Sequence, residues 1–400
     1  MRNRLTIDGG IPVRKEFLPF HRPFLGREEE EALIKTLRSG WITTGPKTRE
    51  FEQKFREYIG CRHAIGLNSC TAGLHLGLVV SGVGAGDEVI TTPITFASTA
   101  NVIIHCGAIP VFVDVEPGTL NIDPRKIEEK ITRKTKAIIP VHFAGNACRI
   151  DEINEIARFH QLAVVEDAAH AIETRYDGKR IGTHGNIACF SFYATKNITT
   201  GEGGILTTDD DELAERARIL SLHGISKDAW KRYGFDGYRH WDILYPGYKY
   251  NMFDLQACLG IEQLKKVDGF FEKRALLVRM YDEAFQEIPE IKGIEIDARV
   301  GPAFHLYVVQ FQTEMMTADR DTIMNAIQAE NIGIGIHFRA IHLHPYYQKT
   351  FGFKRGMYPH AEYASDRVIS LPLCPSMSQD DASDVIQAVR KVTRYFSPKG

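Results

Sequence analysis

Short apolar runs alternate with helical patterns between residues 63 and 208, and this alternation constrains the fold more than any other feature of the chain. Most of the runs are continuously apolar, as expected for parallel strands that are buried on both faces. A helical pattern lies between most of them, which predicts a largely parallel α/β sheet with helices on both faces. The strands are predicted at residues 63–67, 88–92, 110–113, 136–141, 162–165, 187–193 and 204–208.

The chain is long enough for a large core and two domains, with 400 residues of which 44% are hydrophobic. We place the boundary near Asp268, which gives a large domain at residues 1–268 and a smaller C-terminal α/β domain at residues 269–400. The aromatic, charged stretch 224–250 is expected to be a long loop that is functional or mobile. Further helices are predicted at residues 253–267, 271–288, 319–330 and 380–395, and a strand at 303–312.

Composition excludes several classes of protein. Lysine and arginine total 49 and aspartate and glutamate 51, so a formal charge of −2 offers no bulk attraction for nucleic acid or an anionic membrane. The seven cysteines are odd in number and form no CxxC pair, which suggests neither a disulfide framework nor a zinc site. The N-terminus lacks the apolar core of a signal peptide, and no run of about 18 apolar residues exists. We therefore expect a cytoplasmic protein.

A single lysine follows the predicted strand at residues 187–193. Lys196 lies in a polar turn, and three glycines come soon after it. Asp167 follows the predicted strand at residues 162–165, so both side chains are expected at the carboxyl ends of neighbouring strands, where open α/β sheets bind ligands. The two could form a simple ion pair. An amine and a carboxylate are also what pyridoxal phosphate requires, to form the Schiff base and to hold the pyridine nitrogen protonated.

Three segments, EDAAHA, FSFYATKN and GEGG, occur in this order and resemble the DegT/DnrJ/EryC1/StrS family of sugar aminotransferases. The resemblance covers the chain from about Phe20 to the C-terminus. It implies pyridoxal 5′-phosphate as cofactor and the aspartate aminotransferase-like fold (PLP fold type I), with a large domain and a smaller C-terminal α/β domain. It also implies that Lys196 is the Schiff-base lysine and the proton carrier, and that Asp167 pairs with the pyridinium nitrogen.

The segment NSCTAGLHLGL follows a strand and opens an apolar helix, and a helix N-terminus binds phosphate through its free N–H groups. Cys70, Thr71 and Ala72 are the candidates there, and an ordinary N-cap at Ser69 is the alternative. The family uses this turn for the cofactor phosphate and most often has glycine where this chain has Cys70. Phe96 either stacks on the pyridine ring, as the family's aromatic residue does, or belongs to the core.

The resemblance assigns further cofactor contacts. His170 is expected to cover the ring or its 3-hydroxyl, with a structural histidine as the alternative. Ser191 is expected to help hold the phosphate. Asn251 is expected to reach the phosphate of the other subunit, so the active unit would be a homodimer with shared sites; the alternative is an N-cap for the helix that follows. Glu173 stands where the family commonly has glycine.

Substrate contacts are expected from three places. The segment GWITTGP, which contains Thr43, resembles that of members acting at C4 of UDP-sugars. Lys249 could meet a nucleotide diphosphate or the carboxylate of the amino donor. His337 lies in a stretch, 334–347, that resembles the family's C-terminal substrate loop. Although this stretch contains three histidines and Arg339, no HExxH spacing is present and we expect no metal.

The leading interpretation is a transaminase that uses L-glutamate and a keto-sugar nucleotide, with a UDP-4-keto sugar favoured, and gives 2-oxoglutarate and an amino-sugar nucleotide. The reaction would be ping-pong through pyridoxamine phosphate. The alternatives are a C3-aminotransferase on a dTDP-3-keto sugar and a non-catalytic regulatory member. A dehydratase of the same family has histidine in place of the lysine, so Lys196 argues against it. No GxGxxG follows any predicted strand, which disfavours a nicotinamide oxidoreductase.

Overall fold

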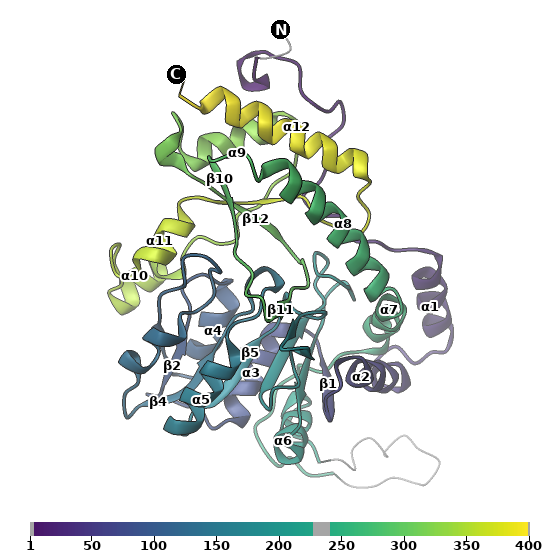
Figure 1. The fold of residues 1–400 in the computed structure, drawn as a ribbon. Coiled ribbons are helices and arrows are strands. Elements are labelled where there is room, and N and C mark those ends of the chain that lie inside the picture. The colour runs from purple at the N-terminus through teal and green to yellow at the C-terminus, as the bar shows by residue number, and fades with distance from the viewer. Residues whose placement is uncertain (1–3, 227–240, 399–400) are drawn as a thin grey trace.

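The fold is seen in a computed structural model that describes residues 4–226 and 241–398. A seven-stranded sheet has the order β1-β9-β8-β5-β4-β2-β3 (Figure 1). Its strands are β1 (His63–Leu67), β2 (Glu88–Thr91), β3 (Ile109–Phe112), β4 (Thr135–Ile139), β5 (Ala163–Asp167), β8 (Ile187–Ser191) and β9 (Gly204–Thr208). All seven predicted strands are thus present. Strand β9 is antiparallel to both neighbours, because the short segment 192–203 returns the chain directly beside β8.

Helices cover both faces of this sheet, as predicted. Alternate residues of each strand point to opposite faces, so Ile90 and Val89 belong to two different cores. One core contains side chains of α2 (Pro46–Ile59), α5 (Ile150–His160) and α7 (Asp254–Leu264). The other contains those of α3 (Cys70–Val80), α4 (Ala97–His105) and α6 (Asp211–Ser221). Helix α1 (Arg27–Arg38) packs on α7.

A second, three-stranded antiparallel sheet has the order β10-β12-β13 and lies above the first in Figure 1. Its strands are β10 (Ile291–Gly293), β12 (Tyr307–Phe311) and β13 (Val368–Leu371). They share a core with α8 (Val267–Phe285), α9 (Arg320–Ala329) and α12 (Gln379–Phe396). Leu5 and Leu18 also belong to that core, so the start of the chain packs beside its end (Figure 1). The domain boundary at residue 268 stays a prediction.

The remaining elements are short. Strands β6 (Arg175–Tyr176), β7 (Lys179–Arg180) and β11 (Val300–Gly301) form a small third sheet. Helices α10 (Pro345–Phe351) and α11 (Pro359–Ser365) precede β13. Most of the long loop expected at 224–250 falls on residues 227–240, which lie outside the described part of the chain. Within the described part, no helix is both long enough and apolar enough to cross a membrane.

Candidate active site

The site lies where β5 and β8 end side by side. These strands are parallel, with Asp167 opposite Cys189, so their carboxyl ends meet at one edge of the sheet. Asp167 is the last residue of β5 and Ser191 the last residue of β8. The chain then turns, and the N–H of Lys196 donates to the carbonyl of Tyr193 at 2.9 Å. The lysine and the aspartate are therefore neighbours at a sheet edge, as their positions in the sequence predict.

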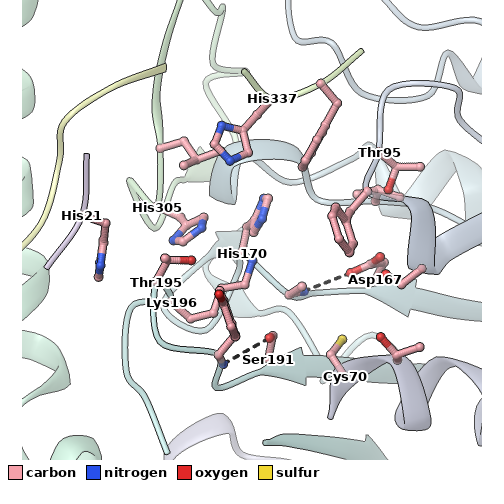
Figure 2. A pocket seen from close by; sticks show the side chains of 18 of the residues that line it. His21, Cys70, Thr95, Asp167, His170, Ser191, Thr195, Lys196, His305 and His337 are labelled. Carbon is pink, nitrogen blue, oxygen red and sulfur yellow. Dashed lines mark hydrogen bonds between the residues drawn. The ribbon is translucent and has the colours of Figure 1, made fainter. Parts of the chain in front are cut away.

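A cavity of about 490 Å³ opens at this edge. In Figure 2, Lys196 and His170 lie between Asp167 on one side and His305 on the other, with Ser191 and Cys70 below them. The predicted site residues that line this cavity are Cys70, Thr71, Phe96, Asp167, His170, Ser191, Lys196 and His337. Four others, Thr43, Ala72, Lys249 and Asn251, do not line it.

Burial disfavours the charged form of both ionisable groups of the site. Burial lowers the pKa of the Lys196 amine to about 8, although the negative charge of Asp167 acts in the opposite direction. Burial also raises the pKa of the Asp167 carboxyl. The Thr99 hydroxyl donates to this carboxyl at 2.7 Å and the Ala169 N–H at 3.2 Å, and both bonds favour the carboxylate. A partly neutral amine therefore faces the same cavity as a hydrogen-bonded carboxylate.

The first turn of α3 forms the floor of the cavity. Ser69 is the N-cap and its hydroxyl accepts from the Ala72 N–H at 3.1 Å, so the alternative role predicted for Ser69 is confirmed. The N–H groups of Cys70 and Thr71 precede the first hydrogen bond of the helix and remain for a ligand. A Cβ atom at Gly204 would lie 2.3 Å from the backbone nitrogen of Cys70. Glycine there lets β9 approach the helix start closely.

Aromatic side chains form the walls. Phe96 is the N-cap of α4 and 63% exposed, so it is not a core residue. The rings of His170 and His305 are 4.3 Å apart, and burial places the pKa of each well below its ordinary value. Burial similarly lowers the pKa of His337 to about 4, helped by the charge of Lys196. The buried Nδ1 atom of His170 has no hydrogen-bond partner among the described residues.

Asn251 lies in a second cavity of about 320 Å³, which Thr44 and Arg218 also line. Its side chain accepts from the Lys249 ammonium at 2.6 Å and donates to Thr44. The alternative role for Asn251, an N-cap, is wrong, because α7 begins at Asp254 with Phe253 as its N-cap. The carbonyl of Thr43 accepts from the N–H of Asp254. Within one chain these residues form a surface beside the main cavity rather than part of it.

The histidines of residues 334–347 have separate partners. His337 Nδ1 lies 2.8 Å from the Ser370 hydroxyl, whereas His342 Nε2 lies 3.0 Å from Glu362. Arg339 donates to the carbonyl of Leu343 at 3.1 Å. These side chains do not converge on a common point, and within residues 4–226 and 241–398 no three His, Cys, Asp or Glu side chains are placed to hold one metal ion.

Several residues that line the cavity or bond to Asp167 were not predicted from the sequence. Thr99 lies one turn after Phe96, so the segment that suggested Phe96 also carried it. His305 lies within the predicted strand at 303–312, where a histidine in a largely apolar run is a usable signal, and the structure buries it just before β12. His21 comes from the N-terminal segment, and no local pattern marks it.

Comparisons with known proteins agree with this geometry. The model of the DegT/DnrJ/EryC1/StrS aminotransferase family matches residues 23–390. The spore coat polysaccharide biosynthesis protein SpsC of Bacillus subtilis is 50% identical over 96% of this chain and 99% of that protein. The PLP-form of Spr1654 from Streptococcus pneumoniae is 33% identical, with a TM-score of 0.89 over 95% of this chain and 99% of that chain. Helicobacter pylori PseC, an aminotransferase involved in the biosynthesis of pseudoaminic acid, is 29% identical, with a TM-score of 0.88 over 96% and 100%.

Proposed function

The chain belongs to the DegT/DnrJ/EryC1/StrS aminotransferase family, and from this premise we propose that it transfers an amino group from L-glutamate to a keto sugar carried on a nucleotide. Dependence on pyridoxal phosphate and a role in amino-sugar biosynthesis follow from the family and its relatives. The observation that carries the proposal is the placement of the Lys196 amine and the Asp167 carboxylate on neighbouring strand ends around one cavity.

The residues of the cavity fit this cofactor. Lys196 supplies an amine that is partly neutral near physiological pH, as covalent attachment to an aldehyde requires. Asp167 supplies a carboxylate for a protonated ring nitrogen. The N–H groups at the start of α3, together with Ser191, supply donors for a phosphate. The unpartnered Nδ1 of His170 leaves one buried polar atom of the wall available to a ligand.

When bound, pyridoxal phosphate supplies an electron sink for the carbon from which a proton is removed. The chain's own residues do the rest. Lys196 takes the proton from the Cα atom of the amino donor as a base, and in the second half of the reaction it returns a proton to the carbon of the sugar that receives nitrogen. Asp167 keeps its negative charge through the bonds from Thr99 and Ala169. His170 and Phe96 provide flat surfaces that limit how a planar ring lies.

We propose a UDP-4-keto sugar as substrate. The support is the segment 40–46, which resembles that of members acting at C4, and the polysaccharide and pseudoaminic acid pathways of two relatives. Thr43, Lys249 and His337 are the residues proposed to contact this substrate. The first two lie on the surface around Asn251, beside the main cavity.

We also propose that the active unit is a homodimer in which Asn251 completes the phosphate site of the partner. Large apolar side chains near Asn251 are exposed in the single chain, including Trp41 (46%), Ile42 (44%) and Phe253 (39%). These residues lie together, because Thr44 bonds to Asn251 and to the carbonyl of Met252. A second copy that covers this surface would bury the apolar groups and bring Asn251 to the other cavity.

The substrate proposal is tested by incubating the loaded enzyme with ¹⁵N-labelled L-glutamate and a panel of nucleotide-linked 4-keto and 3-keto sugars. Mass spectrometry should find the label in an amino sugar formed from a 4-keto, UDP-linked substrate. Label found only in products of dTDP-3-keto sugars would instead support C3 amination. Absence of label from every product, with the cofactor bound, would overturn the proposed function.

A further inference from the structure

A buried chain of hydrogen bonds runs behind Lys196, outside the set of residues assigned above. Arg274 of α8 donates to Glu173 Oε1 at 2.6 Å, and both side chains are at most 5% exposed. The other carboxylate oxygen of Glu173 accepts from the amide Nδ2 of Asn197, the residue after Lys196. Asn197 Oδ1 lies 2.7 Å from His305 Nδ1. This series of hydrogen bonds thus joins α8, which packs on the smaller sheet, to the wall of the cavity.

Donor and acceptor rules fix every orientation in this chain. Arg274 can only donate hydrogen bonds, and an ionised carboxylate can only accept them, so both oxygens of Glu173 are acceptors. Asn197 must therefore turn its NH₂ group towards Glu173, and the Ala303 carbonyl, 3.4 Å from the same nitrogen, favours the same orientation. The Asn197 oxygen then faces His305 and needs a donor. Neutral imidazole has one N–H, so it must be on Nδ1.

His305 is neutral and lines the cavity. Burial lowers its pKa well below the ordinary value, and the neighbouring charges of His170 and Lys196 act in the same direction. Its Nδ1 is engaged by Asn197, so Nε2 is the ring nitrogen left for the cavity. The ring of His170 lies with its centroid 4.3 Å from that of His305 and is tilted by 32° to it, and the two rings share no hydrogen bond. A lone pair on Nε2 therefore faces the ligand.

We propose that Glu173 is a positioning residue that, through Asn197, holds His305 in the tautomer protonated at Nδ1, so that Nε2 accepts a hydrogen bond from the substrate. The donor is a hydroxyl of the keto sugar or the ammonium group of the amino donor, and only this part rests on the proposed function. Burial raises the pKa of the Glu173 carboxyl, and the paired charge of Arg274 and the bond from Asn197 act in the opposite direction and favour the carboxylate.

The test is the tautomer of His305, read from ¹⁵N NMR of cofactor-loaded protein labelled at histidine, with the signal assigned by its loss in His305→Gln. Wild type should show an unprotonated Nε2. In Glu173→Gln, Arg274 still needs an acceptor, so the amide oxygen of the new glutamine faces Arg274 and its NH₂ group faces Asn197. The Asn197 amide must then turn over, so that its oxygen accepts from the glutamine and its NH₂ group faces His305. His305 should then carry its proton on Nε2. Glu362→Gln, at a buried Glu–His pair outside the cavity, should leave the His305 signal unchanged.

Steady-state kinetics distinguish the two possible donors to Nε2, the sugar hydroxyl and the ammonium group of the amino donor. Glu173→Gln should raise KM on the order of tenfold for the keto sugar if a hydroxyl is the donor, or for L-glutamate if the ammonium is. If Glu173→Gln does not fold, Asn197→Ala keeps the buried ion pair and should release His305 into a mixture of tautomers. A protonated Nε2 in wild type, or a tautomer unchanged in the folded variants, would overturn the inference. The NMR result needs no keto sugar, so it stands or fails separately from the proposed function.

Discussion

At Lys196, burial and a neighbouring carboxylate act in opposite directions on one amine. Removal from water lowers the pKa to about 8, and the charge of Asp167 limits the fall. Such an amine is partly neutral at pH 7 to 8 and can still carry a proton. That combination suits a group that must act as base in one half of a transamination and as acid in the other.

The same pKa predicts how the stability of the cofactor-free protein depends on pH. Between pH 8 and 10.5 the unfolded chain binds a proton at Lys196 that the folded chain does not, so the free energy of unfolding rises with pH there. Below pH 8 the buried charge is destabilising. Lys196→Met should therefore raise the free energy of unfolding at pH 7 by on the order of 1–3 kcal/mol, with the gain fading towards pH 10.5.

Urea titrations of both proteins at pH 7 and pH 10 check this prediction. Lys265→Met is the control, because Lys265 is exposed and pairs with Glu262 on the surface. An equal effect of Lys196→Met at both pH values would mean that packing, and not the charge, decides its stability.

The site residues that could be predicted from the sequence lie at or after the end of a strand and within a motif. Asp167 and Lys196 follow apolar runs and Ser191 lies near the end of one, and the order of three motifs indicates their roles. His305 and Glu173 could not be assigned in this way. In the sequence Glu173 stands out only as a departure from a glycine, and its partner Arg274 is 101 positions away. A hydrogen-bond chain across two sheets has no local pattern in the sequence.

Among the elements, the turn from β8 to β9 and the start of α3 act as one unit. Phe192 and Gly203 are joined across the turn by a backbone hydrogen bond of 2.9 Å. Gly204 then lies against the first turn of α3, where an added Cβ would be 2.3 Å from backbone atoms of Ser69 and Cys70. The lysine and the proposed phosphate donors are therefore held in fixed relation.

Gly204→Ala should disturb this unit. The methyl group would push β9 away from α3, at a cost of about 1–3 kcal/mol in the free energy of unfolding. The rise in melting temperature on adding pyridoxal phosphate should also shrink, because the helix start would be displaced. Gly84→Ala is the control, since a Cβ there meets nothing within 4 Å. A variant at Gly204 that kept the full cofactor-dependent rise would contradict the role given to α3.

Elements with a full apolar run were predictable, and short ones were not. The bounds of β1 and β9 agree with those predicted, because polar or glycine residues end both runs. Strands β6, β7 and β11 have two residues each and no periodicity to detect. The predicted strand at 303–312 contracts to β12, Tyr307–Phe311. Its first residues instead bond to Ala144 and Gly145, a contact that only tertiary structure creates.

For the whole molecule, one chain places Asn251 and Lys196 in different cavities. The exposed Trp41, Ile42 and Phe253 mark the surface that would bring them together in a dimer. Because the sequence alone cannot place one chain against another, this part of the site came from family resemblance and remains a proposal.

Subunit exchange tests it. Lys196→Ala and Asn251→Ala dimers should each be inactive, and a mixture should recover part of the activity, because one site in each heterodimer is then intact. Lys196→Ala mixed with Asp167→Ala should recover none, since both residues serve the same chain's cavity. Failure of the first mixture despite demonstrated exchange would place the whole site within one chain.

The central claim is that Lys196 moves the proton in both halves of a transamination. Each half is followed alone through the absorbance of the bound cofactor, adding L-glutamate to the pyridoxal phosphate form and the keto sugar to the pyridoxamine phosphate form. Lys196→Ala should still bind both forms, non-covalently, and convert neither at a measurable rate. Conversion of either form at close to the wild-type rate would show that Lys196 is not the proton carrier, and would contradict the account of the site.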